Sequence, residues 1–305
     1  MKKDLISLKD LSRQEIEEIF ALTDKIKKDK TRFNRCLSGK TLALVFEKPS
    51  CRTRVSFEAG MYELGGYSLY LGPQEINLGV REQIRDVARS LSRYVSGIVL
   101  RTFDHKNVLE MANYATVPVI NGLSDFSHPC QVLSDLYTIR EKFKRLKGIN
   151  LAYVGDGNNN VCHSLLFVCP KVGINLAVAS PLSYQPQKIV LAEAEKWSKK
   201  NKTHFNLTIN PIEAVKNADI IYTDVWTSMG KEKEAQIRRK AFKGYQVNQQ
   251  LVSLAKKNCG IMHCLPAHRG EEITDEVMES KNSIIFEQAE NRLHLQKAIL
   301  ILWLK

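Results

Sequence analysis

A short polar stretch at residues 48–58 has the residue types and spacing to bind a phosphate group. It follows an apolar run at 41–46 and precedes apolar residues at helical spacing, so it forms a turn from a strand into a helix. Free N–H groups and the positive dipole end of such a helix attract anions. Ser50 and Thr53 add hydroxyls, and Arg52 adds a planar guanidinium. A helix cap followed by solvated arginines would explain the same residues.

Two more polar positions follow predicted strands in the first half of the chain. Arg101 ends the strand predicted at 97–101, and His128 precedes a helix that begins at Pro129. His128 and Gln131 are three residues apart and therefore share one helical face, where two donors could polarise a carbonyl oxygen. A histidine that only caps the helix or fills the core remains the alternative.

In the second half, Asp224 closes a predicted strand and is followed by a small-residue loop at 225–230. A carboxylate beside loop amides suits a ligand with an ammonium and a carboxylate group, although an Asx-turn would explain the same residues. The asparagines at 158–160 follow another strand and offer donors and acceptors to such a ligand. This segment begins like a dinucleotide fingerprint, but Cys162 stands where a small residue is needed, so a nicotinamide cofactor is not expected.

Cysteines and histidines gather near the end of the second half, at Cys259, His263, Cys264 and His268. The paired cysteines of a zinc knuckle are missing. Adjacent residues of the strand predicted at 260–264 should also face opposite sides, so no metal site is expected. Cys264 is instead expected to act as a single active-site thiol.

The last predicted helix, 287–304, carries Gln288 and Arg292 on one face. An exposed arginine is the simpler interpretation of this pair. A further contact with a phosphate or a carbonyl oxygen is the functional one.

The elements that must position these residues alternate between strands and helices. We expect strands at 41–46, 67–71, 97–101, 117–120, 151–154, 175–179, 205–208, 219–224 and 260–264. We expect helices over 12–28, 84–94, 108–114, 129–144, 161–172, 187–200, 211–217, 249–257, 275–280 and 287–304, and a polar loop at 72–83. This alternation predicts the α/β class with two doubly wound domains, each a mostly parallel sheet flanked by helices. Ligands gather outside the carboxyl ends of such strands, where the candidate residues lie.

A length of 305 residues favours two domains. The charged end of the helix at 129–144 marks the boundary between a first domain of residues 1–147 and a second of residues 148–285. The last helix is expected to pack back on the first domain and complete it with residues 286–305. Two helices would then join the domains.

Composition limits the classes of function. Hydrophobic residues make up 44% and charged residues 26%, which is typical of a folded globular protein. The net charge of +12 suits an anionic ligand or nucleic acid, but the lysine clusters lack interleaved aromatic residues. Seven irregularly spaced cysteines and no signal peptide predict free thiols in a reducing cytoplasm. The apolar run at 298–304 is too short to cross a membrane.

Five stretches, taken in order, resemble the aspartate/ornithine carbamoyltransferase family and most closely its ornithine branch. They are similar to the family's S-T-R-T-R, H-P-x-Q, D-x-W-x-S-M-G, H-C-L-P and F-x-Q-A-E-N-R motifs, and lie at 50–54, 128–131, 224–230, 263–266 and 286–292. The resemblance covers essentially the whole chain. It departs at Cys51, where the family has a threonine, so a hydroxyl is lost while the backbone N–H remains.

The resemblance implies transfer of the carbamoyl group of carbamoyl phosphate to the δ-amine of L-ornithine, giving L-citrulline and phosphate in arginine biosynthesis. No metal or organic cofactor is implied. The residues implied to bind carbamoyl phosphate are Ser50, Cys51, Arg52, Thr53, Asn77, Arg101, His128, Gln131, Cys264, Leu265 and Arg292. Those implied to bind ornithine are Asn160, Asp224, Ser228 and Met229. The implied catalytic residues are Arg101, His128, Cys264 and Asp224.

In the implied mechanism, Arg101, His128 and Thr53 donate to the carbonyl oxygen, whose negative charge grows as the tetrahedral intermediate forms. The δ-amine resembles a lysine with a pKa of about 10.4, so forming the neutral nucleophile at about pH 7.4 costs about 4 kcal/mol. Cys264 and Asp224 would orient this amine, and the phosphate would take its proton. The resemblance also implies domain closure, with carbamoyl phosphate binding first.

A homotrimer, or a multiple of trimers, is the implied assembly, with no nucleic-acid or membrane partner. In the family, the loop at 72–83 extends into the site of a neighbouring subunit. Asn77 is carried over as a contact of that kind, and Arg81 is not.

Carbamoyltransferases for putrescine, acetylornithine or aspartate are the alternatives within the family. The Asp224 carboxylate and the loop at 228–230 favour a free amino acid with an α-ammonium group, which disfavours the first two. An aspartate enzyme is expected to carry an H-P-L-P-R segment, where this chain has His263-Cys-Leu-Pro-Ala-His-Arg269. Outside the family, a basic nucleic-acid-binding protein is the alternative that the charge allows.

Overall fold

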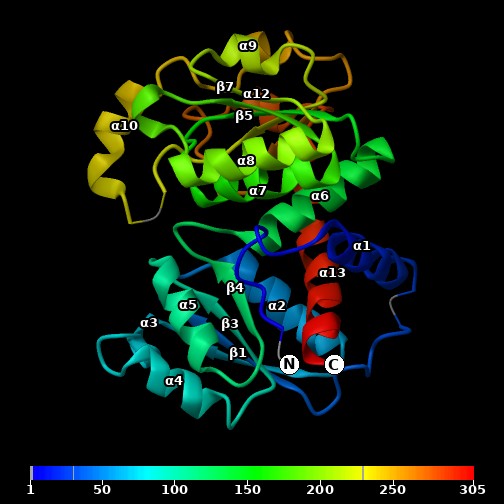
Figure 1. Ribbon diagram of the computed structural model, residues 1–305, viewed down its shortest axis with the longest axis vertical. Coiled ribbons are helices and arrows are strands. Elements are labelled where there is room, and N and C mark those ends of the chain that lie inside the picture. The colour runs from blue at the N-terminus through cyan, green and yellow to red at the C-terminus, as the bar shows by residue number, and fades with distance from the viewer. Residues whose placement is uncertain (1–2, 30, 229) are drawn as a thin grey trace. The chain divides into compact units, whose positions relative to one another are not determined.

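The computed structural model describes residues 3–29, 31–228 and 230–305 and divides the chain into two compact units. The first unit comprises Met1–Tyr137 and Glu290–Lys305, and the second comprises Thr138–Ala289. Each unit contains one parallel sheet with helices on both faces (Figure 1), which confirms the predicted α/β class. The helices α6 (Pro129–Phe143) and α13 (Ile285–Leu304) each run from one unit into the other. The domain limits of 1–147 with 286–305, and of 148–285, remain a prediction from the sequence.

The sheet of the first unit has the order β2-β1-β3-β4, with every neighbouring pair parallel. Its strands are β1 (Thr41–Phe46), β2 (Tyr67–Leu71), β3 (Gly97–Arg101) and β4 (Val119–Leu123). Its helices, besides α6 and α13, are α1 (Arg13–Lys28), α2 (Cys51–Glu63), α3 (Pro73–Ile76), α4 (Ile84–Leu91) and α5 (His105–Tyr114). The chain passes from β1 to β2 in one direction along the sheet and from β3 to β4 in the other, so the loops that follow β1 and β3 diverge. Such sheets bind ligands in the crevice between two diverging loops, outside the carboxyl ends of the strands.

Both faces of this first sheet are covered. Ala43 and Val45 of β1 pack in a core with Val87 of α4 and Val108 of α5, while Leu44 on the other face of β1 is also fully buried. In Figure 1, α4 and α5 lie on one side of the sheet, and α2 and α13 lie on the other. Burial on both faces explains why β1 and β3 are almost continuous apolar runs with the predicted bounds. The edge strand β2 also has the predicted bounds, although its side chains are exposed or only partly buried.

The sheet of the second unit has the order β7-β6-β5-β8-β9 and is also parallel throughout. Its strands are β5 (Asn150–Val154), β6 (Asn175–Ala179), β7 (Phe205–Thr208), β8 (Ile220–Thr223) and β9 (Gly260–His263). Its helices are α7 (Asn160–Val172), α8 (Lys188–Asn201), α9 (Pro211–Val215), α10 (Ala235–Ala241), α11 (Gln249–Val252) and α12 (Asp275–Met278), with 3₁₀ turns η1 (Leu182–Tyr184) and η2 (Glu232–Glu234). The chain crosses from β7 to β8 on the far side of β5, so the ligand crevice is expected outside the ends of β5 and β8.

Helices α7 and α8 lie on one side of the second sheet, and α9 and α12 lie on the other (Figure 1). The core on the α9 side includes Trp226, which stacks on Phe242 with ring centroids 5.7 Å apart and planes 12° apart. Tyr184 packs against the same Phe242 ring at 4.8 Å. The three rings come from three segments: Tyr184 follows β6, Trp226 follows β8, and Phe242 caps the end of α10. Their packing holds these segments together.

Several elements differ from the sequence expectation. Helix α10 was not predicted, because the one buried residue of this helix is Arg238 and no apolar stripe marks it. The helix predicted over 249–257 ends at Val252, and the expected polar loop at 72–83 contains the short helix α3. Helix α1 begins after Ser12 as predicted, because Ser12 and Glu15 form a capping box.

Within the described ranges, no helix combines the length and the apolar composition that crossing a lipid bilayer requires.

Candidate functional site

The predicted anion turn forms where β1 passes into α2. Ser50 is the N-cap of α2, and its hydroxyl accepts a hydrogen bond from the Thr53 N–H at 3.3 Å. Cys51 is exposed and Arg52 is half-buried, so both lie at the open end of the helix. No acidic residue occupies this first turn, which leaves the positive end of the helix dipole available to an anion.

Thr53 is the centre of a buried hydrogen-bond network in the first unit. Its Oγ1 atom accepts from Arg101 Nη1 at 3.5 Å and from Arg292 Nη2 at 3.2 Å. Arg292 Nη1 also donates to Gln131 Oε1 at 2.6 Å. The structure therefore brings together Thr53, Arg101, Gln131 and Arg292, which were predicted from four separate stretches of the sequence.

Each of these side chains is at least nine-tenths buried, so the two guanidinium groups are held in a low-dielectric environment. The amide nitrogen of Gln131 donates to Asp135 Oδ1 at 2.8 Å, which turns the amide oxygen of Gln131 toward Arg292. We call the group of Thr53, Arg101, Gln131 and Arg292 the arginine network.

His128 precedes α6 and is 5% exposed. Burial, followed by the charge of Arg292, lowers the pKa of His128 well below its usual value. Further positive charges act in the same direction, from Arg101, Lys48 and Arg52. At neutral pH the imidazole is therefore uncharged, and it can donate one hydrogen bond through its single N–H group.

Lys48 is a buried residue that the sequence interpretation left out of the site. Burial and the charge of Arg101 lower the pKa of Lys48 to about 8, although Asp125 and Glu47 oppose this shift. Its ammonium lies 4.6 Å from the centre of the Phe103 ring. The signal for Lys48 was present, because this residue opens the polar stretch that predicted the anion turn.

Asn77 lies outside the arginine network. It is an exposed residue that caps the C-terminus of α3 with a left-handed backbone (φ 37°). Its predicted role toward a neighbouring subunit stays a prediction.

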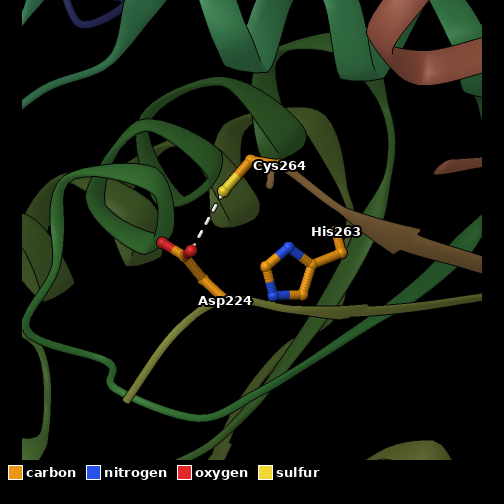
Figure 2. Close-up of side chains that lie close together, drawn as sticks. All are labelled: Asp224, His263 and Cys264. Atoms are coloured by element: carbon orange, nitrogen blue, oxygen red, sulfur yellow. Dashed lines mark hydrogen bonds between the residues drawn. The ribbon is translucent and has the colours of Figure 1, made fainter. Parts of the chain in front are cut away.

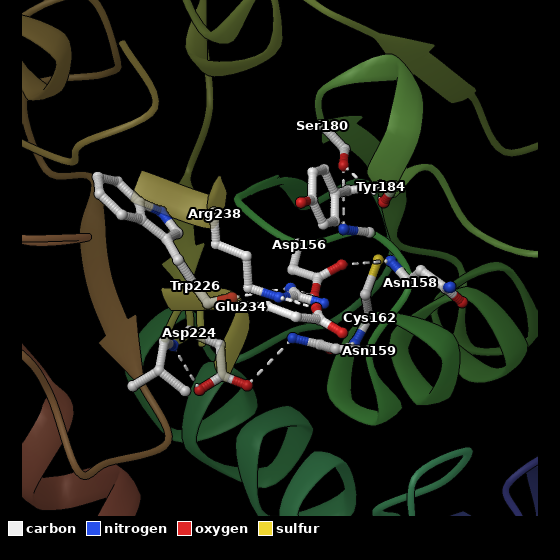
Figure 3. Close-up of polar contacts among 12 residues, drawn as sticks. Asp156, Asn158, Asn159, Cys162, Ser180, Tyr184, Asp224, Trp226, Glu234 and Arg238 are labelled. Atoms are coloured by element: carbon white, nitrogen blue, oxygen red, sulfur yellow. Dashed lines mark hydrogen bonds and ion pairs between the residues drawn. The ribbon is translucent and has the colours of Figure 1, made fainter. Parts of the chain in front are cut away.

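In the second unit, Asp224 directly follows β8 and receives hydrogen bonds on both carboxylate oxygens. Cys264 Sγ donates to Oδ1 at 3.0 Å (Figure 2), and Asn159 Nδ2 donates to Oδ2 at 3.2 Å (Figure 3). The Val225 N–H donates to Oδ1 at 2.8 Å. Asp224 is 8% exposed, so the structure holds a nearly buried carboxylate at the end of β8.

Asn159 was missed by the sequence interpretation, which selected its neighbour Asn160. The Asn159 side chain caps α7 by accepting from the Cys162 N–H at 2.8 Å, and its amide also donates to the Tyr153 hydroxyl at 2.8 Å. Asn160 is the first residue of α7 and is partly exposed. Both asparagines belong to the run that predicted this site, but the residue type alone could not separate them.

Arg238 is a second missed residue, and it joins several loops at the ends of the strands (Figure 3). Its Nη1 atom donates to Asp156 Oδ2 at 2.7 Å and to the Trp226 carbonyl at 2.9 Å. Its Nε atom donates to Glu234 at 2.8 Å, and the guanidinium lies 4.8 Å from the centre of the Tyr184 ring. Arg238 and Asp156 are both buried, and the charge of Asp156 helps to raise the pKa of Arg238.

Gly157 allows the loop after β5 to approach the segment after β6 closely. A Cβ atom at this position would lie 2.8 Å from Pro186 Cδ and 3.0 Å from the Tyr184 carbonyl oxygen. The Gly157 N–H donates to Ser180 Oγ at 3.0 Å. The glycine therefore fixes the loop that carries Asp156.

Cys264 and Leu265 follow β9 and, like Asp224 after β8, belong to the second unit. The strand ends at His263, so the alternation expected over 260–264 does not reach Cys264. The argument from opposite faces was wrong, because the ligand atoms of Asp224, His263 and Cys264 lie within 4.8 Å of one another (Figure 2). Both ring nitrogens of His263 are engaged in hydrogen bonds, to the Leu265 N–H and to Glu272, so metal binding there would have to break one of them.

Ser228 is partly exposed in the loop after Asp224. Met229, the remaining residue predicted to bind ornithine, lies outside the described residues.

Comparison with known proteins matches both halves of the chain to one family. Residues 3–141 match "Aspartate/ornithine carbamoyltransferase, carbamoyl-P binding domain", and residues 147–303 match "Aspartate/ornithine carbamoyltransferase, Asp/Orn binding domain". The chain is 54% identical over 302 residues to the ornithine carbamoyltransferase of Thermococcus kodakarensis, covering 98% of this chain and 96% of that protein. The solved structure of the Pyrococcus furiosus ornithine carbamoyltransferase is 53% identical, with a TM-score of 0.95 over 99% of this chain and 97% of that one.

An anabolic ornithine carbamoyltransferase from Campylobacter jejuni is also similar in structure, with a TM-score of 0.94 at 36% identity, over 99% of each chain. The family matches span both units, and they include the arginine network as well as Asp224 and its partners Asn159 and Cys264. This chain therefore belongs to the aspartate/ornithine carbamoyltransferase family.

Proposed function

We propose that this protein transfers the carbamoyl group of carbamoyl phosphate to the δ-amine of L-ornithine, giving L-citrulline and phosphate. The relatives that support this choice of substrate are named ornithine carbamoyltransferase and match over nearly their full length. A relative from Pyrococcus furiosus that is 53% identical is named anabolic, which favours the direction of arginine biosynthesis.

The observation that carries the proposal is the arginine network beside a buried, uncharged His128. Thr53, Arg101, His128 and Gln131 lie in the part of the chain that matches a carbamoyl phosphate-binding domain, and Arg292 joins them from the last helix. Two buried guanidiniums can stabilise a phosphate and a developing oxyanion far better than exposed ones.

The turn at the start of α2 is proposed to hold the phosphate through Ser50, Cys51, Arg52 and Thr53. Arg101, His128 and Thr53 then donate to the carbonyl oxygen of the carbamoyl group. Negative charge accumulates on this oxygen in the tetrahedral intermediate, so preorganised donors lower the barrier. Gln131 and the Leu265 backbone contact the carbamoyl amide, and Arg292 supports the same ligand.

Ornithine is proposed to bind in the second unit. Its α-ammonium would meet the carboxylate of Asp224 and the hydroxyl of Ser228. Its α-carboxylate would meet Asn160 and the Met229 amide. The nearly buried Asp224, already hydrogen-bonded on both oxygens, supports this arrangement because it is held in one orientation.

The reaction forms a bond from the δ-nitrogen to the carbamoyl carbon and breaks the bond from that carbon to the phosphate oxygen. Cys264 and Asp224 are proposed to orient the neutral amine, and the departing phosphate takes the proton that the amine loses. No metal or organic cofactor enters this scheme. If Cys264→Ala left both turnover and its pH profile unchanged, the role given to the thiol would be wrong.

One assay tests the function directly. Carbamoyl phosphate is supplied with ornithine, putrescine, acetylornithine or aspartate, and the carbamoylated product of each amine is measured. We expect citrulline to dominate, and Asp224→Asn to raise the KM for ornithine. Efficient carbamoylation of one of the other amines, or salt-dependent DNA binding without citrulline formation, would overturn the proposal.

We also propose that carbamoyl phosphate binds before ornithine, the order that the family resemblance implies together with domain closure. Isothermal titration of ornithine, alone and with a stable carbamoyl phosphate analogue, tests the order. Equally tight binding in both titrations would contradict it.

The assembly is proposed to be a homotrimer or a multiple of trimers. Strand β2 lies at the edge of the first sheet, where an uncovered strand invites pairing or coverage. Large apolar side chains of α2, β2 and the following loop are exposed here, namely Val55, Tyr62, Tyr67, Leu69 and Val80. Asn77 belongs to the same exposed loop.

The cytoplasm is the proposed compartment. All seven cysteines are free, which suits a reducing environment.

A further inference from the structure

A buried pair of titratable residues, His263 and Glu272, adjoins the proposed site and takes no part in the chemistry described above. Both side chains are fully buried, and His263 Nε2 lies 3.1 Å from Glu272 Oε1. Figure 2 shows the His263 ring beside Asp224 and Cys264. His263 directly precedes Cys264 in the chain.

The hydrogen bonds around His263 determine which ring nitrogen carries the proton. The Leu265 N–H donates to His263 Nδ1 at 2.8 Å, so Nδ1 is an acceptor and holds no proton. The proton of the neutral ring must then be on Nε2, which donates it to Glu272 Oε1. The same Oε1 atom accepts from the His268 N–H at 2.6 Å.

Leu265 needs such support because its backbone is in the left-handed region, with φ of 58°. This conformation is unfavourable for a residue with a side chain, and neighbouring contacts must hold it in place. The hydrogen bond to His263 Nδ1 is one such contact. Cys264 lies between these two residues, and its thiol donates to Asp224.

We propose that Glu272 is a positioning residue: through His263, it holds Cys264 and Leu265 in the geometry that carbamoyl transfer needs. The carboxylate fixes the Nε2–H form of His263, this form accepts the Leu265 N–H, and the segment 264–265 is held at both ends. The inference rests on the proposed function, because it assigns Cys264 and Leu265 to the carbamoyl transfer step.

A purely stabilising role accounts poorly for this pair. Glu272 Oε2 is buried and has no hydrogen-bond partner within the described ranges, so the carboxylate is only half satisfied. Burying a polar group in this state costs free energy, and apolar side chains of similar volume would fill the same space without that cost. What the pair supplies instead is a directed acceptor at His263 Nδ1.

Three substitutions of Glu272 separate these roles in the full-length protein. Glu272→Gln keeps an oxygen that can accept from His263 and His268, Glu272→Asp keeps the charge but shortens the reach, and Glu272→Leu removes the acceptor. The matched control is Glu276→Leu, the same change at an exposed residue of α12. The Asp variant keeps the test possible if the Leu variant does not fold.

Two quantities are measured for each folded variant. The first is kcat for citrulline formation, and the second is the rate at which iodoacetamide alkylates Cys264, followed by mass spectrometry of its peptide. The half-buried Cys36, in the other unit, serves as the internal reference. Alkylation reports on the position of Cys264 even if the protein has a different substrate.

We expect Glu272→Leu and Glu272→Asp to lower kcat at least about tenfold and to change Cys264 alkylation several-fold, because a positioned reacting group is sensitive to small displacements. Glu272→Gln should stay within about threefold of the wild type in both quantities. Glu276→Leu should change neither, and Cys36 alkylation should be constant throughout.

Wild-type kcat and alkylation in folded Glu272→Asp and Glu272→Leu would overturn the inference and reduce the pair to a structural role. Equal losses in Glu272→Gln and Glu272→Leu would also overturn it, because the charge rather than the acceptor would then matter. Absence of citrulline formation by the wild type would refute the proposed function instead, and the alkylation rates would still show whether Glu272 positions Cys264.

Discussion

Burial changes what the cationic side chains of the first unit can do. Arg101 and Arg292 are less than one-tenth exposed and share the Thr53 hydroxyl, so each guanidinium is held in a fixed direction. The charge of an exposed arginine would instead be screened by water and by salt ions. From the sequence, Arg101 was expected to donate to a carbonyl oxygen and Arg292 to contact a phosphate or a carbonyl oxygen. The structure adds that both guanidinium groups belong to one buried network.

Lys48 should make the binding of carbamoyl phosphate dependent on pH. Its pKa is lowered to about 8, so it loses its positive charge as the pH rises through that value. An anion binds the charged form better, and for a single linked proton the affinity should fall about tenfold from pH 7 to pH 9. The KM for carbamoyl phosphate over this range measures the effect. Lys48→Met should weaken binding at pH 7 and flatten the dependence, and an equally steep curve would assign it to another group.

Cys51 offers a change that should improve the site. A thiol is a weak donor, whereas a threonine hydroxyl at the start of α2 would bond a phosphate oxygen at a net gain of about 0.5–1.5 kcal/mol. Cys51→Thr should therefore tighten binding of inorganic phosphate about two- to tenfold in isothermal titration. Cys36→Thr, a change at a half-buried cysteine outside the turn, is the control. Unchanged affinity in Cys51→Thr would mean that position 51 contacts the anion through its backbone alone.

Some site residues could not have been predicted from the sequence. Residue type and position after a strand were enough to select Arg101, His128 and Asp224. Which of Asn159 and Asn160 contacts Asp224 depends on the geometry of the α7 cap, and the residue types alone do not specify this geometry. Arg238 gave no signal, because its partner Asp156 is 82 residues away in the chain.

At the scale of elements, the strands were easier to predict than the short helices. A central parallel strand is buried on both faces, so its apolar run begins and ends with the strand itself. Helices of four to seven residues, such as α3, α10 and α11, depend on tertiary contacts rather than on an apolar stripe, and of these three α11 alone has a side-chain N-cap bond, made by Asn248. Asp104 caps α5 and starts it at His105, three residues before the predicted start at Val108.

Helix α10 should matter for ornithine more than for carbamoyl phosphate. Arg238 joins the loop after β8 to Asp156 after β5, so Arg238→Met should loosen the segments that hold Asp224. We expect the KM for ornithine to rise about tenfold or more, with the affinity for phosphate unchanged. Unfolding should also become easier by about 3–5 kcal/mol, because Asp156 is left buried without its partner.

The control for this helix is Arg239→Met, which removes an exposed neighbour paired with Glu271 at 2.7 Å. Such a pair contributes at most about 1 kcal/mol, so the control should be close to the wild type. Arg238→Lys serves if the Met variant does not fold. A normal KM for ornithine in a folded Arg238 variant would show that α10 does not position the ornithine site.

At the scale of the whole molecule, the exposed apolar side chains near β2 bear on assembly. If they cover one another in a homotrimer, the native mass will be three times the chain mass of 34.7 kDa. Tyr62→Arg with Tyr67→Arg should shift the mass in analytical ultracentrifugation toward the monomer and lower turnover. Leu109→Arg, at an exposed position on α5, should leave the mass unchanged. A fully active wild-type monomer at low concentration would rule out sites shared between subunits.

The first unit is assembled from both ends of the chain, whereas the second is one continuous stretch. During synthesis the ribosome therefore releases all of residues 138–289 before the last helix that completes the first unit. Arg292 is synthesised after the whole of the second unit, yet it bonds to Thr53 and Gln131, which precede that unit in the chain. The nascent first unit therefore keeps part of its apolar surface uncovered until residues 290–305 have been synthesised, and over that interval it is exposed to misfolding and aggregation.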